Sequence, residues 1–419
     1  MRLLICLFGI LVFISGCSSQ NPHEKTIVVG IQNTVFTRKA YAGAKERFEK
    51  AHPGVRLKEL SSTGISYYQK MQTMFAGNSE PDVMWMGMGF GDFAAKGVLE
   101  DLSPYIAREP KDFTANINKQ ALASYRRGTR QFGLPFGVDF QILCYNKDMF
   151  DKAGLKYPNP AWTKNDVLNA ARKLTVIGKR RRPEIYGLVG MIDWSSFGGR
   201  LVSDNGDQVL VNSPEMAQYL SYTRDLVTKF KVSPAGESEQ VVGMNNTMMF
   251  ATGRSGMIVA GDYDLTNIAQ SSKLRWGVCI MPQMGGNTRS IWASTAGFCM
   301  SKRCKNKKLA WELIKTYISP EFMKEYYPST MPSDTKCLKD VLEKDKQFPS
   351  GTSEAMIESL KCLYVQPRTK GVFEVQSAFS LAAENFWNTD MAPHQVLTEA
   401  EKKIRPLLEP IDQAGNYNK

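Results

Sequence analysis

The sequence has little of what most metal centres and hydrolytic active sites require. It contains three histidines, His23, His52 and His394, and none of its eight cysteines forms a CxxC pair. Metal sites built from imidazole and thiolate need several such side chains at defined spacings. Neither HExxH nor GxSxG occurs, because Gly253-Arg254-Ser255-Gly256 continues into Met257 where the second glycine of a nucleophile elbow would stand. We therefore predict no metal, no cofactor and no catalytic residue.

Long apolar runs are also scarce, and the one present lies at the N-terminus. Leu3–Ile14 is uncharged and follows Met1-Arg2. A membrane-spanning helix needs roughly 20 apolar residues, so this run has instead the length of a signal-peptide core. Its end, Ile14-Ser15-Gly16-Cys17, resembles the bacterial lipobox, which implies cleavage before Cys17 and acylation of its thiol. We expect residues 1–16 to be a signal peptide and 17–25 to be a lipid anchor and tether; the alternative is a buried N-terminal strand.

The predicted export of the chain argues against nucleic acid, the partner that its net charge suggests. The chain of 419 residues carries a formal charge of +12, and clustered Lys and Arg bind nucleic acid by releasing counterions. The one dense cluster, Lys179–Arg182, ends at Pro183 and contains no aromatic residue. We interpret it as a solvated turn and expect no nucleic-acid partner for an exported chain.

Six cysteines remain after Cys6 and Cys17, which belong to the signal and the anchor. An exported protein can pair them as disulfides, but six cysteines allow 15 pairings. The pairs Cys299–Cys304, Cys279–Cys299 and Cys337–Cys362 are examples that the sequence leaves open. The six are Cys144, Cys279, Cys299, Cys304, Cys337 and Cys362.

The mature chain begins with alternating strands and helices. Residues 26–31 are apolar on both faces, as a strand of a parallel sheet requires, and residues 38–50 carry apolar side chains at helical spacing. A second strand over 55–60, a helix over 64–76 and a third strand over 81–86 complete the pattern. This order predicts an α/β fold, and ligands of open α/β sheets bind at the carboxyl ends of the strands. Here those ends are the turns 32–34, 61–64 and 87–91.

Further segments, read in order, resemble the extracellular solute-binding proteins of sugar importers, the group that includes maltose-binding protein. They are Phe48–Val55, Met74–Asn78, Pro81–Val83, Leu134–Asp139, Tyr145–Phe150, Ala153–Leu155, Phe250–Met257, Gly261–Tyr263 and Asn306–Trp311. The resemblance implies a periplasmic-binding-protein fold, in which two α/β lobes are joined by hinge crossings. We expect lobe 1 to comprise 25–135 and 283–328, and lobe 2 to comprise 136–282 and 329–419.

A sugar site needs flat aromatic rings for the C–H faces and polar groups that replace water on the hydroxyls. Among the candidates, Tyr263 occupies the aromatic position of the Gly261–Tyr263 signature of the family that the chain resembles. The candidate rings are Trp85, Phe90, Trp194, Phe197, Tyr263 and Trp292, and the candidate polar residues are Asn33, Tyr68, Asp139, Gly261, Asp262 and Arg368. Each of these residues also has a structural interpretation as core or as a surface ion pair.

The resemblance implies an exported, membrane-anchored subunit of an ABC importer that captures a sugar in the cleft by hinge closure. We expect a monomer whose partners are permease subunits and whose only contact with a membrane is its N-terminal lipid. A polyol or glycerol phosphate is another candidate solute. The competing hypotheses are an exported carbohydrate-active enzyme and a signalling or surface receptor that uses the same fold.

Overall fold

The computed structural model describes residues 25–179, 182–234, 244–271, 273–384 and 386–408. The predicted signal peptide, Cys17 and most of the tether lie outside these residues, as do Arg180 and Arg181 of the basic cluster. In the part of the chain that is described, no helix is both long and apolar enough to cross a membrane.

The first five predicted elements are confirmed, with ends that differ by one or two residues. The strands β1 (Lys25–Gln32), β2 (Val55–Ser62) and β3 (Val83–Met86) alternate with the helices α1 (Arg38–Ala51) and α2 (Gly64–Ala76). Strands β2 and β3 both pair with β1 in parallel. Parallel pairing directs all three carboxyl ends to one edge of the sheet, where the sequence predicted a site.

One sheet runs through the whole molecule in the order β2-β1-β3-β11-β6-β9-β8-β7. Its centre is β6 (Gly133–Asn146), whose first part pairs with β11 (Ile291–Met300) and whose second part pairs with β9 (Ser255–Gly261). The remaining strands are β4 (Arg126–Arg127), β5 (Arg130–Gln131), β7 (Val176–Ile177), β8 (Pro183–Val189), β10 (Trp276–Cys279), β12 (Met331–Pro332) and β13 (Leu363–Val365).

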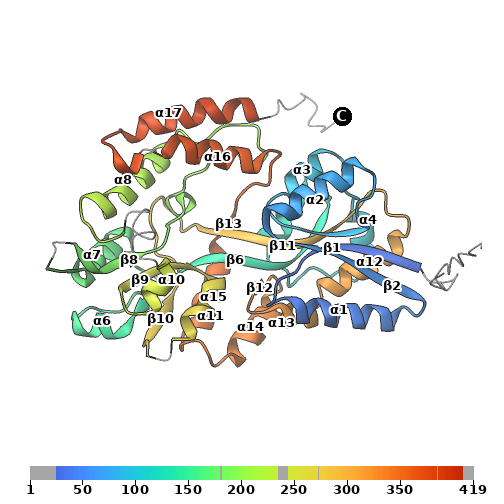
Figure 1. Ribbon diagram of the computed structural model, residues 1–419, viewed down its shortest axis with the longest axis horizontal. Coiled ribbons are helices and arrows are strands. Elements are labelled where there is room, and N and C mark those ends of the chain that lie inside the picture. Colours follow the sequence, from blue (N-terminus) through green and yellow to red (C-terminus); the bar gives the residue numbers. More distant parts are fainter. Residues whose placement is uncertain (1–24, 180–181, 235–243, 272, 385, 409–419) are drawn as a thin grey trace, which may run out of the picture.

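Helices cover the sheet in two groups, which give the molecule the predicted two-lobed α/β architecture (Figure 1). We call the half around β1–β3 the first lobe and the half around β8–β10 the second lobe. The residue boundaries of the lobes remain a prediction. The other helices are α3 (Phe90–Ala95), α4 (Ser103–Ile106), α5 (Lys119–Ala123), α6 (Lys147–Lys152), α7 (Lys164–Leu174), α8 (Pro214–Thr228), α10 (Asn246–Ala251), α11 (Leu265–Ala269), α12 (Lys307–Tyr317), α13 (Pro320–Tyr326), α14 (Thr335–Lys344), α15 (Thr352–Ser359), α16 (Val372–Ala383) and α17 (Pro393–Ile404).

The start of α7 at Thr163 shows how local sequence fixes an element, because Thr163-Lys164-Asn165-Asp166 has the spacing of a capping box. The carboxylate of Asp166 accepts hydrogen bonds from the backbone N–H and the hydroxyl of Thr163, at 2.8 and 2.7 Å. These two hydrogen bonds hold the N-cap residue Thr163 at the start of α7. Val167, Ala171 and Leu174 then face the core of the second lobe.

Each lobe buries its own apolar core. In the second lobe, residues of β6, β9, α7, α8, α16 and α17 form one large cluster. In the first lobe, one cluster lies between the sheet and α1, α12 and α13, and a second lies between the sheet and α2 and α3. The cores are therefore separate enough for the strands between them to act as connections.

The six cysteines that the structure describes are all free thiols, and five of them are buried. None of the pairings that the sequence left open is formed. Burial raises the pKa of Cys279 to about 11 and the pKa values of Cys304 and Cys337 to about 12. These thiols therefore stay protonated and unreactive at neutral pH.

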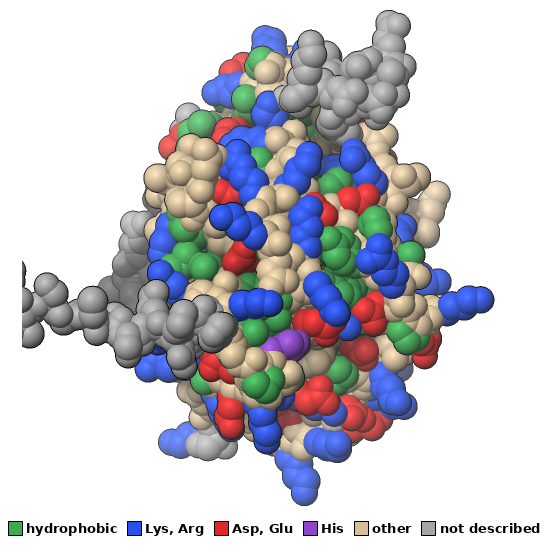
Figure 2. Space-filling view, turned by 90° about the vertical axis from the view of Figure 1, so that its right-hand side faces the viewer, with side chains coloured by type: hydrophobic (Ala, Val, Ile, Leu, Met, Phe, Trp, Pro, Cys, Tyr) green, Lys and Arg blue, Asp and Glu red, His purple; other side chains and the backbone are tan. Residues whose placement is uncertain are grey.

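The outer end of the first lobe shows how the positive charge is distributed. On this face Lys and Arg side chains are spread over the surface among Asp and Glu (Figure 2). Part of the net charge of +12 is thus carried by scattered side chains.

Candidate functional site

The floor of the candidate site is formed by the two strands that connect the lobes. In the antiparallel pair of β6 and β11, Ser294 lies opposite Asp139 and Ala293 lies opposite Phe140. Because alternate residues of a strand share a face, Trp292, Ser294 and Asp139 lie on one side of the sheet. These three are half-buried, whereas Ala293 and Phe140 on the other side are buried in the core. A polar and aromatic row thus crosses between the lobes.

Two carboxyl groups meet at the second-lobe end of this row. Asp262 directly follows β9 and is fully buried; its Oδ1 accepts a hydrogen bond from the backbone N–H of Phe140 at 2.7 Å. Its Oδ2 is buried without a hydrogen-bond partner. Asp139 accepts a hydrogen bond from the hydroxyl of Thr330. The sequence proposed both acids separately, and the structure brings them together.

Burial dominates the electrostatics of this acid pair. Loss of hydration raises the pKa of Asp139 to about 6, although the hydrogen bond from Thr330 opposes the shift. Burial, and then the nearby charge of Asp139, raise the pKa of Asp262 well above its ordinary value. The shift favours the protonated form of Asp262, whose carboxyl group can donate as well as accept.

Tyr263 lies next to the acid pair and remains accessible. Its side chain is 49% exposed, which is unusual for a tyrosine ring beside a buried strand end. A Cβ atom on Gly261 would lie 2.2 Å from Cζ of this ring, so the glycine permits the ring to fold back over the strand. Gly261 and Tyr263 together present an aromatic face beside two carboxyl groups.

Gln141, on β6 in the floor, is hydrogen-bonded to residues 191–193 of the second lobe. Its side-chain amide donates to the carbonyl of Met191 at 2.7 Å, and its oxygen accepts from the backbone N–H of Asp193 at 3.3 Å. Asp193 is buried, and burial raises its pKa to about 6. Trp194 follows, half-buried and packed edge-on against Phe379. The sequence did not single out Gln141 or Asp193.

Phe197 and Phe90 differ from expectation, because both are fully buried. Phe197 packs against Tyr219 and Tyr222 in the second-lobe core. Phe90 packs against Tyr125 in the first lobe. In this structure neither ring offers a face to a solute.

Two further candidates, Tyr68 and Trp85, line the first-lobe wall. The hydroxyl of Tyr68 accepts from the backbone N–H of Gly87 at 3.1 Å, and its ring lies 6.2 Å from that of Trp85. The ring of Tyr68 also lies 5.6 Å from Phe373 on α16. Trp85 is half-buried, and its Nε1 is buried without a hydrogen-bond partner.

The loop after β1 contains apolar side chains that sequence reasoning missed. Asn33 accepts a hydrogen bond from the hydroxyl of Thr37 at 3.3 Å. Val35 and Phe36 follow it with 72% and 79% of their surfaces exposed. The sequence did contain a signal for this feature. Large apolar residues in a turn at a strand end are unusual, since a turn that serves only as a connection normally exposes polar side chains.

A groove of about 730 Å3 lies between α2 and α3 of the first lobe and α16. Its lining mixes aromatic rings with amide and hydroxyl groups, a composition suited to a polar solute with apolar faces. The lining residues are Tyr68, Gln69, Gln72, Asp92, Phe93, Phe373, Glu374, Gln376, Ser377, Ser380 and Leu381. The sequence identified Tyr68 alone among them, because α16 reaches this place only through the tertiary fold.

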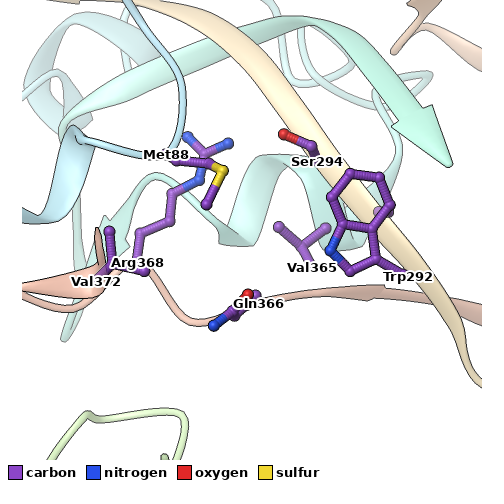
Figure 3. A pocket seen from close by; sticks show the side chains of 8 residues that line it. Met88, Trp292, Ser294, Val365, Gln366, Arg368 and Val372 are labelled. Carbon is purple, nitrogen blue, oxygen red and sulfur yellow. The ribbon is translucent and has the colours of Figure 1, made fainter. Parts of the chain in front are cut away.

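A second, much smaller cavity of about 20 Å3 lies on the floor. Figure 3 shows Arg368 rising beside Met88 toward β11, with Ser294 and Trp292 on the other side of the cavity. Arg368 is only 4% exposed. Trp292 and Arg368 are thus brought together, although 76 residues separate them in the sequence. Within the described residues, no group of three or more His, Cys, Asp or Glu side chains is arranged to hold a metal ion.

Comparison with known proteins identifies the family. The sequence profile described as "Bacterial extracellular solute-binding protein" matches residues 33–324, which is more than half of the chain. The chain belongs to this family. Among curated relatives, a putative binding protein of Brucella abortus is 24% identical over 283 residues. That match covers 64% of this chain and 66% of the relative, so the chain spans about two thirds of the relative's length.

Solved structures of solute-binding proteins share the fold over nearly their whole length. An ABC substrate-binding protein from Listeria monocytogenes in complex with cycloalternan superposes with a TM-score of 0.75 at 25% identity, covering 91% of this chain and 98% of that one. A sugar transporter protein from Rhizobium etli, in an open conformation, gives a TM-score of 0.76 at 21% identity, covering 91% and 99%. The family that the sequence resembled is confirmed.

Proposed function

We propose that this solute-binding protein is the lipid-anchored receptor subunit of an ABC importer for a mono- or oligosaccharide. The observation that carries the proposal is the half-exposed ring of Tyr263 beside the half-buried Asp139 and the fully buried Asp262, next to the strands that join the two lobes. The ring suits the apolar face of a pyranose, and the carboxyl groups suit its hydroxyls. The cycloalternan complex of the Listeria relative supports the same class of solute.

Closure of the two lobes would convert binding into a signal for the permease. A solute that touches Tyr263 on one lobe and the Tyr68 wall on the other favours the closed form through its contacts with both. The strands β6 and β11, which run between the separate cores, would twist in such a movement. Periplasmic binding proteins in general close around their ligands by a hinge movement of this kind. We propose the boundaries 25–135 with 283–328, and 136–282 with 329–419, for the moving halves.

Anchoring through Cys17 follows from the lipobox and is part of the same proposal. The lipid would hold the receptor at the outer surface of the membrane beside its permease. Mass spectrometry of the protein extracted from membranes tests this part: we expect a mature N-terminus at Cys17 carrying acyl chains. A Cys17→Ala variant should leave the membrane fraction, and its retention there would contradict the anchor.

The acid pair supports binding over glycoside hydrolysis. A glycosidase needs two carboxyl groups that reach the scissile bond from either side. Asp262 is fully buried and uses one oxygen to hold the backbone of Phe140. A carboxyl group in that position can orient its neighbours but cannot approach a glycosidic oxygen.

The test is calorimetry with Tyr263→Ala, after a thermal-shift screen of neutral mono- and oligosaccharides has given a ligand. We expect the affinity to fall at least about tenfold, since an aromatic stack contributes about 1 kcal/mol beyond the area it buries. Stability should change little because half of the ring is exposed. Tyr186→Ala is the matched control: Tyr186 pairs with Ser255 at the opposite end of β9. Unchanged affinity in Tyr263→Ala would remove this ring from the site.

A further inference from the structure

The outer edge of β11 has a gap at the point where the two lobes meet. On the side away from β6, β11 pairs with β13 at Ile291–Ala293 and with β3 at Gly297–Met300. Strand β13 runs parallel to β11 and β3 runs antiparallel, so both end at the gap, with Val365 opposite Ala293 and Met86 opposite Gly297. The carboxyl ends of two strands therefore converge on residues 294–296, where α/β sheets bind ligands.

Arg368 fills this gap. Its Nη2 donates to the carbonyl of Thr295 at 2.5 Å and also to the Thr295 hydroxyl. Its guanidinium carbon lies 4.5 Å from the ring centroid of Tyr125, whose own hydroxyl donates to the carbonyl of Met86 at 2.6 Å. The guanidinium group is thus fixed in position before any solute arrives.

The charge of Arg368 is not compensated. Among the described residues no carboxylate forms an ion pair with it, and its Nη1 is buried without a hydrogen-bond partner. Arginine does not lose its proton in proteins, and a buried charge without a counter-ion is strongly unfavourable. The protein therefore keeps a desolvated cation beside the cavity that Ser294 and Trp292 also line.

A neutral hydroxyl could accept a hydrogen bond from the free N–H of Arg368 but could not compensate its positive charge. An anionic oxygen would satisfy both, and charge-assisted bonds to guanidinium groups are about twice as strong as neutral ones. The cavity of about 20 Å3 admits a group of roughly the size of one water molecule. Ser294 offers a hydroxyl to the same group, and Trp292 offers an indole ring to the atoms that follow it.

We propose that Arg368 forms a subsite for an anionic group, so that the solute carries a carboxylate or phosphate next to its hydroxyls. This inference rests on the proposed function, and it narrows the solute from sugars in general to acidic sugars or sugar and polyol phosphates. The anionic oxygen takes the place of water in the cavity. The remaining hydroxyls then lie along the floor toward Asp139 and Tyr263.

Calorimetry on the full-length protein with matched ligand pairs tests the proposal. The carboxylate arm compares glucuronate with glucose and galacturonate with galactose; the phosphate arm compares glucose 1-phosphate with glucose and glycerol 3-phosphate with glycerol. We expect at least one acidic ligand to bind about tenfold or more tightly than its neutral partner. The arm in which this happens identifies the anion, and inorganic phosphate alone shows whether the subsite acts without the sugar.

Arg368→Gln should weaken binding of the acidic ligand by at least about 30-fold, as loss of one partner of a buried charged pair does. Binding of the neutral ligand should weaken by less than about threefold. Arg224→Gln is the control, because Arg224 also donates to a backbone carbonyl, that of Met391 at 2.7 Å, and lies over an aromatic ring, Phe386. If Arg368→Gln fails to fold, the wild-type ligand pairs decide alone.

The outcomes separate this inference from the proposed function. Neutral sugars that bind as tightly as acidic ones would overturn the anionic subsite and leave the sugar receptor intact. An acidic preference that survives in Arg368→Gln would overturn the assignment to Arg368. If no ligand of these pairs and no sugar of the thermal-shift screen binds, the sugar receptor itself is refuted, and the subsite with it.

Discussion

The two ends of the floor, formed by β6 and β11, hold ionisable side chains of opposite charge in different ways. At one end burial raises the pKa values of Asp139 and Asp262, which makes it easier for these acids to become neutral by taking up a proton. At the other end Arg368 is buried but cannot become neutral. The comparison shows that a buried acid can be a self-sufficient part of the fold, whereas a buried guanidinium without a carboxylate implies a partner from outside.

The largest loss of stability that tests this comparison is expected at the Arg368 end of the floor. A Cβ atom on Gly91 would lie 2.2 Å from the carbonyl oxygen of Arg368 and 2.3 Å from that of Thr369. Because both contacts are to backbone, Gly91→Ala must displace the segment that carries Arg368. We expect a loss of about 3 kcal/mol in the free energy of unfolding, measured by urea denaturation.

Gly77→Ala is the control for that variant, since the nearest atom to its new Cβ is 3.5 Å away. It should leave stability nearly unchanged. Equal stability of Gly91→Ala and wild type would mean that the segment after β13 is not held against α3, and that Arg368 is not fixed in advance.

A smaller effect should appear as a pH dependence at the acid end of the cleft. Asp193 has a pKa of about 6 in the folded protein, whereas an unfolded aspartate ionises near pH 4. Between these values the folded state binds more protons, so the free energy of unfolding falls as pH rises from about 4 to about 6. Asp193→Asn keeps an acceptor for the Ser195 N–H and should reduce this fall by on the order of 2 kcal/mol.

Denaturation curves recorded across that pH range for wild type and Asp193→Asn provide the measurement. Asp139 contributes in the same direction, so some slope should remain in the variant. An identical slope in both proteins would show that Asp193 ionises in the fold as it does in water.

The smallest effect is expected from Asp262→Asn. A protonated carboxyl group and an amide have nearly the same shape, and the amide oxygen can still accept from the N–H of Phe140. Stability at pH 7 should therefore change by less than about 1 kcal/mol. A loss of several kcal/mol, measured by the same denaturation, would reveal that Asp262 is ionised and that the two ends of the floor are not different in kind.

The sequence predicted those parts of the fold that depend on local pattern. The apolar strand at 26–31 and the amphipathic helix at 38–50 match β1 and α1 closely, because periodicity and the stop at Pro53 are local signals. The helix start at Thr163 follows from four consecutive residues. The family follows from the order of its motifs along the chain.

The candidate site was predictable residue by residue but not as an arrangement. Asp139, Tyr263, Trp292 and Arg368 were each singled out, yet the register that sets Ser294 opposite Asp139 is visible only in the sheet. The inward direction of Phe90 could not be read from the glycines beside it. The gap at the edge of β11 could not be predicted from the sequence, because it depends on where β13 and β3 end.

The free thiols have a practical consequence for testing whether the lobes move. Because five of the six described cysteines are buried and their pKa values are raised where a shift is resolved, they compete poorly for maleimide dyes. A fluorophore pair on cysteines introduced at exposed positions of the two lobes needs Cys362, the half-buried sixth, to be replaced in this part of the chain. Energy transfer between the dyes would then report the distance between the lobes as each solute is added.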